Sequence, residues 1–287
     1  MVALGANRAG GSGRLDRTGD VIPGNSPARC SSFHVSRTLP ECALLDETPA
    51  CHTSRQQMLA DRVRPTSMAR PPHRWPAVDD DCLFCAVNHA SDEALEWYDR
   101  PIFRDPEAGV AIAALGSFVP GYVLVAPAWH LSSVQGLPTG VVSGFIDFLT
   151  RVVDQVETAF GPCTVFEHGS CRSSERRRSA CLTHAHAHVI PGRYSLGSLG
   201  LPVRVFDDFA TFAALPVQDR FDGYLMYREP DGPVCYAEDL GVSQYFRRHI
   251  AATLGAADDW DYAVFPHWDN MRLSIRELTS TPTRIGI

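Results

Sequence analysis

The hydrophobic positions divide the chain into a polar leader and a longer part with regular apolar patterns. Residues 1–75 are rich in Gly, Ser, Arg, Pro and Thr, and no apolar period lasts more than a few residues. A segment of this composition buries too little apolar surface to offset its loss of conformational entropy. We therefore expect residues 1–75 to be disordered or poorly ordered, and the folded region to begin near Asp81.

One stretch, 139–160, has the apolar period of an amphipathic helix. Its apolar residues recur at intervals of three and four, which places them on one helical face, and Gly161-Pro162 ends the pattern. We expect a single long helix whose apolar face packs on the core. The residues of that face are Val142, Phe145, Leu149, Val152, Val153, Val156 and Phe160.

Shorter apolar runs, separated by Gly, Pro and Asp, predict strands. Two further stretches, 207–214 and 243–254, are expected to be short helices, the second with Ser243 as a possible N-cap. The aromatic-rich stretch 260–275 is expected to pack back on the core. The predicted strands are 97–98, 101–104, 109–115, 122–126, 164–166, 182–190, 224–228 and 233–237.

The strand predicted at 182–190 carries histidines at alternate positions, His184, His186 and His188. Side chains at alternate positions of a strand project from one face. The imidazoles should therefore line up, while the small apolar residues between them point into a core. The alternatives are a chance His-rich tract and a surface metal cluster.

The composition argues against several classes of binding and catalytic site. The net charge of −7 argues against general nucleic-acid binding. All 26 basic residues are arginine, so lysine Schiff-base chemistry and a P-loop lysine are excluded.

The nine cysteines are irregularly spaced and no signal peptide opens the chain, so we expect reduced cysteines and a cytoplasmic protein. The uncharged run 109–129 is broken by Gly and Pro into strand-sized pieces, so we expect no membrane span.

Cys82 and Cys85 form a Cys-x-x-Cys pair at the start of the region expected to fold. Such a pair can be a redox couple, part of a metal site or an accident. A redox couple usually opens a helix after a strand, a context that the sequence does not indicate. A metal site needs two further ligands, for which His130 and His184 are candidates.

The ordered series from Cys82 to Pro191 resembles the histidine triad superfamily of nucleotide hydrolases and transferases. Members share the His-x-His-x-His pattern followed by two apolar residues. They also have a passage very similar to the one here, in which Pro120-Gly121 enters an apolar strand that ends in Pro-x-x-His. The resemblance implies an α+β fold: an antiparallel sheet with one long helix, a zinc knuckle and a C-terminal α+β extension. It implies a domain at 76–195, with 196–287 packing on it.

The resemblance also implies roles for the histidines. The middle one, His186, is the expected nucleophile at phosphorus, and His188 is expected to hydrogen-bond a phosphate oxygen or the leaving group. In the zinc-containing branch, two cysteines, the Pro-x-x-His histidine and the first triad histidine bind zinc. Two thiolates and two imidazoles make a closed tetrahedral set, which is typical of a structural zinc site. The ligands carried over are Cys82, Cys85, His130 and His184.

The residues before the triad are expected to contact the substrate. Negative charge that develops on a phosphoryl group needs fixed donors, which the arginines after residue 171 and the backbone near Gly169 could supply. The sequence departs from the family in two places. Residues 111–115 offer no acidic or amide side chain for a ribose, and Cys181 and Glu167 stand where members often have Ser or Thr and Asn. The expected substrate-binding residues are Glu167, His168, Gly169, Arg172 and Cys181.

These features lead us to expect a hydrolase of phosphoanhydride, phosphoester or phosphoramidate bonds to a nucleotide, working through a phosphohistidine. A dinucleoside polyphosphate and a nucleoside phosphoramidate are the expected types of substrate, and His188 at the third triad position favours water as the acceptor. The alternatives are nucleotidyl transfer or phosphorolysis in small-molecule biosynthesis, a catalytically silent zinc-stabilised nucleotide-binding module, and a metal-dependent hydrolase with the histidines as ligands. The expected partner is a small nucleotide or phosphate ester, not nucleic acid or a membrane. Members of the superfamily often dimerise, so the resemblance also implies a homodimer.

Overall fold

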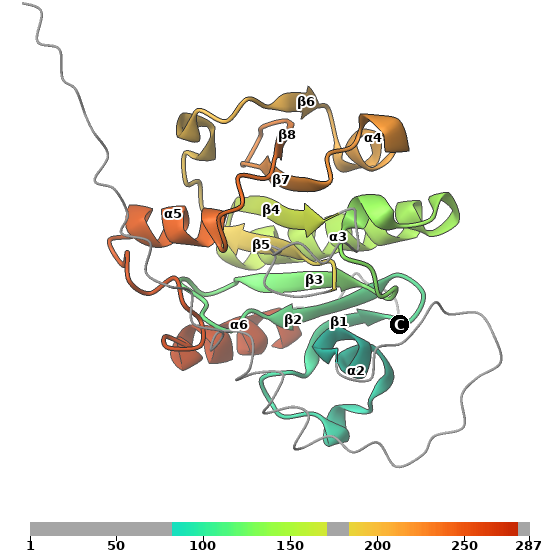
Figure 1. Ribbon diagram of the computed structural model, residues 1–287. Coiled ribbons are helices and arrows are strands. Elements are labelled where there is room, and N and C mark those ends of the chain that lie inside the picture. The colour runs from blue at the N-terminus through green and yellow to red at the C-terminus, as the bar shows by residue number, and fades with distance from the viewer. Residues whose placement is uncertain (1–81, 171–183, 281–287) are drawn as a thin grey trace, which may run out of the picture. The chain divides into compact units, whose positions relative to one another are not determined.

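An antiparallel sheet of eight strands runs through the part of the chain that the computed structural model describes, residues 82–170 and 184–280. The strands are β1 (Pro101–Asp105), β2 (Gly109–Ala113), β3 (Val123–Pro127), β4 (Cys163–Ser170), β5 (Ala187–Pro191), β6 (Arg204–Phe206), β7 (Gly223–Arg228) and β8 (Val234–Glu238). Figure 1 shows them in the order β1-β2-β3-β5-β4-β7-β8-β6. Together with the helices, this sheet confirms the expected α+β class.

The helices lie before, between and after the strands. The α-helices are α2 (Leu83–His89), α3 (Thr139–Phe160), α4 (Phe209–Ala213), α5 (Tyr245–Thr253) and α6 (Trp268–Ser280). Short 3-10 turns are η1 (Asp92–Ala94), η2 (Val134–Gly136), η3 (Leu196–Leu199) and η4 (Val217–Asp219). Within the described ranges, no helix is both long enough and apolar enough to cross a membrane.

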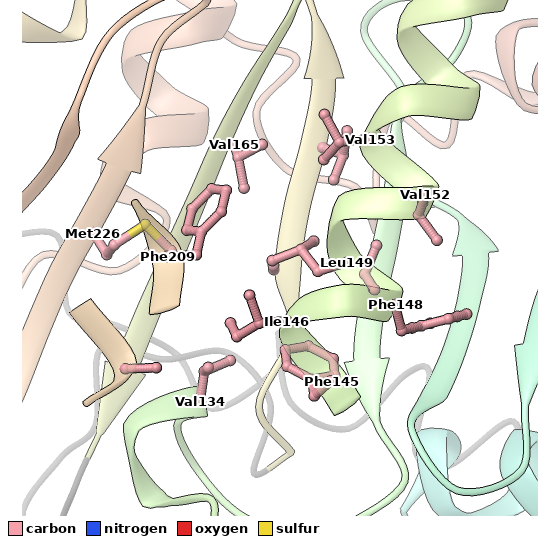
Figure 2. Packing of buried hydrophobic residues seen from close by; sticks show 14 of the residues in the cluster. Val134, Phe145, Ile146, Phe148, Leu149, Val152, Val153, Val165, Phe209 and Met226 are labelled. Atoms are coloured by element: carbon pink, nitrogen blue, oxygen red, sulfur yellow. The ribbon is translucent and has the colours of Figure 1, made fainter. Parts of the chain in front are cut away.

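Helix α3 is the long helix that the apolar spacing predicts, and its bounds agree with the prediction. It packs on β5, β2, β3 and β4. Figure 2 shows Phe145 and Leu149 of α3 in one apolar cluster with Val165 of β4 and Met226 of β7. The helix ends at Gly161, whose φ of +89° and ψ of −178° lie in a region that only glycine readily adopts.

The other face of the sheet carries a second apolar cluster. Leu124 of β3, Phe166 of β4 and Ile190 of β5 belong to it. The valines next to them in the strands, Val123, Val125, Val165 and Val189, belong to the cluster under α3. Phe84 of α2 and Phe246 of α5 pack into the same cluster. Because adjacent strand residues point to opposite faces, α2 and α5 cover the face of the sheet that α3 does not.

The C-terminal third of the chain continues the sheet. Strand β7 pairs with β4 from Val165↔Arg228 to Ser170↔Gly223, and β8 pairs with β7 on one side and β6 on the other. The sheet therefore runs across residue 195, where the sequence suggests that an extension begins.

Some expected elements differ in the structure. Residues 97–98 form a turn rather than a strand, and their rings contact Trp268 of α6. Helix α5 begins at Tyr245 after Gln244, which has a φ of +57° and makes no side-chain cap, so Ser243 is not the N-cap. Strand β6 was not expected, because its three residues are largely exposed and leave no alternating pattern.

Candidate metal centre and adjoining histidine site

The histidine segment enters the sheet later than its pattern predicts. His184 and His186 precede β5, which begins at Ala187, and only His188 lies within the strand. The first two residues of the predicted strand, 182–183, lie outside the described ranges.

A proline explains this shorter strand. If the register of β3 and β5 continued, Ala185 would lie opposite Pro127, which has no N–H to donate. The Ala185 N–H instead donates to the Leu131 carbonyl, at 2.5 Å. The alternation still holds, because Ala185, Ala187 and Val189 all join the cluster under α3. The side chains of His186 and His188 are thereby directed to the other face.

Four potential metal ligands meet beside this segment. Cys82 and Cys85 come from the start of α2, His130 follows β3, and His184 precedes β5. Their ligand atoms all lie within 4.8 Å of one another. The Sγ of Cys82 lies 3.4 Å from Nδ1 of His184. The Sγ of Cys85 lies 3.2 Å from Nδ1 of His130 and 3.7 Å from Nδ1 of His184.

These distances suit one tetrahedral ion. Sulfur and nitrogen ligands at usual zinc bond lengths are about 3.6 Å apart. The Nε2–H of His184 donates to the Pro127 carbonyl at 2.8 Å, which leaves the Nδ1 lone pair facing the cysteines. The Cys85 thiol, and then the His184 ring, lower the pKa of the Cys82 thiol, which favours the thiolate that binds metals. The donor set is therefore compatible with a structural zinc ion.

One ring nitrogen of His186 is held by a hydrogen bond, and the other makes no hydrogen bond to the described part of the chain. Its Nδ1 lies 2.9 Å from the carbonyl oxygen of His184. A carbonyl only accepts, so Nδ1 carries the hydrogen and Nε2 keeps its lone pair. The Phe84 ring, between the two cysteines in the sequence, stacks on the His186 ring at 5.5 Å. Burial lowers the pKa of His186 to about 4, so the ring is neutral near pH 7.

His188 lies beside His186, with 4.8 Å between the ring centroids. Its ring stacks on Phe166 at 4.3 Å and 7°, and its Nδ1 lies 2.7 Å from the Tyr122 hydroxyl. Burial, followed by the neighbouring His186 and Arg247, holds the pKa of His188 well below its usual value. Two neutral imidazoles therefore lie side by side on this face of the sheet.

His168 lies on the same face of β4 as Phe166, two residues away. Its Nε2 lies 2.9 Å from Oδ1 of Asp239, just after β8. The Phe166 ring stacks on the His188 ring, so this face of β4 is the face on which His188 lies. It therefore joins the histidine site.

Gly169 and Glu167 face the other way. A Cβ on Gly169 would lie 2.3 Å from Cζ of Tyr224, so glycine allows close packing there. Glu167 is 1% exposed and accepts bonds from the Val134 N–H at 2.8 Å and the Tyr224 hydroxyl at 2.5 Å. Burial raises the pKa of Glu167 to about 7, although both hydrogen bonds act to lower it.

The structure therefore separates Glu167 from the histidines, although the sequence analysis grouped it with the substrate-binding residues. Successive side chains of a strand alternate, so Glu167 and His168 cannot both face the site. Arg172 and Cys181, also expected to bind substrate, lie outside the described residues.

The sequence analysis missed four residues of this face: Phe84, Tyr122, Asp239 and Arg247. Phe84 and Tyr122 lie within motifs that the sequence already singled out, the Cys-x-x-Cys pair and the Pro-Gly entry. Asp239 and Arg247 lie more than fifty residues beyond the triad in the chain, and no local pattern marks them. Only the pairing of β7 and β8 onto β4, followed by α5, brings them to the site.

Comparisons with protein-family models and with curated proteins do not identify a family for this chain. No protein-family model matches the sequence, and no curated protein matches it significantly. The function is therefore inferred from the chemistry of the residues described above.

Proposed function

We propose that this chain belongs to the histidine triad superfamily and hydrolyses a phosphoanhydride, phosphoester or phosphoramidate bond to a nucleotide. The proposal combines the resemblance of residues 82–191 with the geometry of the site. The ordered motif series supports the family, and the paired neutral imidazoles support the chemistry.

The observation that carries the proposal is the hydrogen bond from Nδ1 of His186 to the His184 carbonyl. An imidazole is a good nucleophile when one nitrogen is protonated and held and the other presents its lone pair. The neighbouring His188 ring is well placed to interact with the same phosphoryl group, because the ring centroids are 4.8 Å apart.

The reaction follows from these roles. Nε2 of His186 forms a bond to phosphorus while the bond from phosphorus to the leaving group breaks, and the leaving group keeps the electron pair. His188 supplies a hydrogen bond to a phosphate oxygen or to the leaving group. Water then attacks phosphorus while the N–P bond breaks, and the electron pair of that bond returns to Nε2 of His186. The water oxygen and one of its hydrogens remain on the released nucleotide, and its other proton passes through solvent to the departed leaving group.

We further propose that the ion held by Cys82, Cys85, His130 and His184 is a structural zinc. The set is closed, since four protein ligands leave no open position for a water or substrate. A zinc ion would supply rigidity there rather than a reactive water. Phe84, between the two cysteines, contacts both His184 and His186, so a rigid metal centre would help to position the nucleophile.

The test is incubation of the purified protein with a panel of labelled adenylyl and guanylyl compounds. The panel includes dinucleoside polyphosphates and nucleoside phosphoramidates, with and without added phosphate as an alternative acceptor. Phosphorus NMR would identify the products, and intact mass after rapid quenching would detect a nucleotide adduct. We expect turnover by the parent protein, an adduct on His186, and no turnover by His186→Ala.

His249→Gln is the matched control, since the ring of His249, on α5, donates to the Tyr194 carbonyl and has no place in the proposed reaction. Turnover that survives in His186→Ala would contradict the proposal. Products that appear only with added phosphate would indicate transfer rather than hydrolysis. Nucleotide binding by a folded, zinc-loaded parent without turnover would indicate a silent binding module.

A further inference from the structure

Arg247 of α5 is a buried cation that forms no ion pair with a carboxylate of the described residues. It is 3% exposed, and among the described residues no Asp or Glu oxygen lies within ion-pair distance of its guanidinium. Its Nε and Nη2 donate to the Trp260 carbonyl at 3.2 and 3.1 Å, and Nη2 also donates to the Gly116 carbonyl at 3.1 Å. Its guanidinium lies 4.5 Å from the centre of the Phe118 ring. Burying a charge in this way is unfavourable, so Arg247 is an unusual choice for a purely structural position.

The remaining donor of Arg247 leads to the histidine site. Its Nη1 lies 3.2 Å from the Tyr122 hydroxyl oxygen, and Tyr122 is the only side chain among its hydrogen-bond acceptors in the described ranges. Arginine has donors and no acceptor, so the phenolic oxygen must accept this bond. A hydroxyl that accepts from a cation is polarised and becomes a stronger donor.

The direction of the next bond follows from the hydrogen of that hydroxyl. Tyr122 is fully buried, and in the described part of the chain His188 Nδ1, at 2.7 Å, is the only acceptor in contact with its oxygen. If Nδ1 carried a hydrogen, the hydroxyl hydrogen of Tyr122 would have no acceptor, which is costly in a buried position. The hydroxyl therefore donates to Nδ1, and the single proton of the ring is on Nε2.

This arrangement is the opposite of that at His186. The His184 carbonyl holds the proton of His186 on Nδ1, whereas the Tyr122 hydroxyl holds the proton of His188 on Nε2. Phe166 fixes the orientation of the His188 ring by stacking on it. Two adjacent histidines are thereby differentiated, one as a lone-pair donor and the other as a hydrogen-bond donor.

We propose that Arg247 and Tyr122 are positioning residues that hold His188 as its Nε2–H tautomer, so that it can donate a hydrogen bond to the phosphoryl group that His186 attacks. The tautomer stands on the hydrogen bonds alone, and its use in catalysis rests on the proposed function.

The tautomer can be measured without substrate. The full-length, zinc-loaded protein would be labelled with ¹⁵N-histidine, and long-range ¹H–¹⁵N correlation spectra at neutral pH would distinguish protonated from unprotonated ring nitrogens. The His188 signals are those lost in His188→Gln. We expect the parent to show a protonated Nε2 and an unprotonated Nδ1.

Tyr122→Phe keeps the ring and removes only the hydroxyl, so we expect the Nδ1–H form of His188 to become populated. Arg247→Met, which keeps an apolar stem and removes the charge, should shift the tautomer in the same direction but less. Tyr194→Phe is the control, since the Tyr194 hydroxyl donates to the Pro191 carbonyl and to no histidine. Its His188 signals should match those of the parent.

A protonated Nδ1 in the parent, or an unchanged His188 tautomer in folded Tyr122→Phe, would overturn the proposal. For a parent that turns over nucleotide, we expect Tyr122→Phe to lower kcat about 10- to 100-fold, the size typical of losing a partner that orients a functional histidine, with a smaller change in KM. A shifted tautomer with unchanged kcat would overturn the catalytic use of the tautomer. A parent with the expected tautomer and no turnover would instead count against the proposed function.

Discussion

At the scale of single residues, hydrogen bonds give three identical side chains different chemistry. His184 donates from Nε2 to the Pro127 carbonyl and offers Nδ1 to a metal. His186 donates from Nδ1 and offers Nε2. His188 accepts at Nδ1 from Tyr122. Which nitrogen of a histidine is available is decided by the bond that the other nitrogen makes. The partners of His184 and His188 lie in another part of the chain, whereas the partner of His186 is the carbonyl two residues before it.

The metal centre gives a prediction at this scale. Cys85→Ser removes one thiolate, so we expect the zinc content to fall from about one ion per chain to nearly none, with a lower unfolding temperature. Elemental analysis after dialysis and thermal unfolding would measure both effects. Cys235→Ser is the control, because Cys235 lies outside the cluster of potential ligands. Equal metal content in the two variants would rule out the assigned ligand set.

Glu167 gives a prediction for the dependence of stability on pH. Burial raises the folded-state pKa of Glu167 to about 7, above the ordinary value of 4.5. The folded protein therefore binds a proton more tightly than the unfolded chain. The resulting stabilisation is complete below about pH 4.5, is lost as the pH rises, and is gone above about pH 7.

Glu167→Gln mimics the protonated acid and does not titrate. We expect the unfolding free energy of the parent to fall, relative to that of Glu167→Gln, by up to about 3 kcal/mol between pH 5 and pH 8. Urea unfolding of both proteins at several pH values would measure this difference. Parallel pH profiles for the two proteins would show that Glu167 does not titrate in this range.

At the scale of elements, α3 follows closely from its own sequence. Its apolar spacing, its start at Thr139 and its end at Gly161 can all be read locally. Local patterns suffice there because the period of the helix, its burial and its stop signal agree with one another.

Two glycines at this helix provide a matched test. Gly144 lies in the exposed interior of α3, where an added Cβ would meet nothing within 4 Å. Gly144→Ala should raise the unfolding free energy by about 0.5–1 kcal/mol. A Cβ on Gly161 would also meet nothing within 4 Å, but its φ is +89°, so Gly161→Ala should lower stability by about 1–3 kcal/mol. Chemical denaturation would measure both, and two changes of the same sign would contradict the argument.

At the scale of the whole molecule, the C-terminal third completes the sheet. Strand β7 covers the edge of β4 along six residue pairs. The same third provides Tyr224 for Glu167, Asp239 for His168 and, as the second partner of Tyr122, Arg247. The apolar cluster under α3 and the histidine site therefore both depend on chain segments beyond residue 195.

Truncation tests this dependence. A fragment of residues 76–195 lacks β7, so β4 would expose a row of unpaired N–H and C=O groups. We expect this fragment to aggregate or to lose cooperative unfolding, whereas residues 76–287, which contain every described residue, should unfold in one transition. Circular dichroism during urea denaturation would separate these outcomes. Cooperative unfolding of the shorter fragment would show that a domain of residues 76–195 folds alone.

Periodic patterns in the sequence predicted helix α3 and most of the strands. The resemblance of the ordered motif series implied the α+β class and the four residues that meet as potential metal ligands. The period of a helix or a strand is contained in a short window of the chain, whereas the four ligands extend from Cys82 to His184 and form an ordered series rather than a local pattern. Three features could not be predicted from the sequence: the late start of β5, the orientation of Glu167 away from the histidines, and the contact of Arg247 with Tyr122. Those outcomes depend on Pro127, Tyr224 and α5, which come from other strands and helices, and the contact of distant segments leaves no period in a single sequence. The histidine motif can therefore be read from the chain, but the tautomer of each histidine can be read only from the fold.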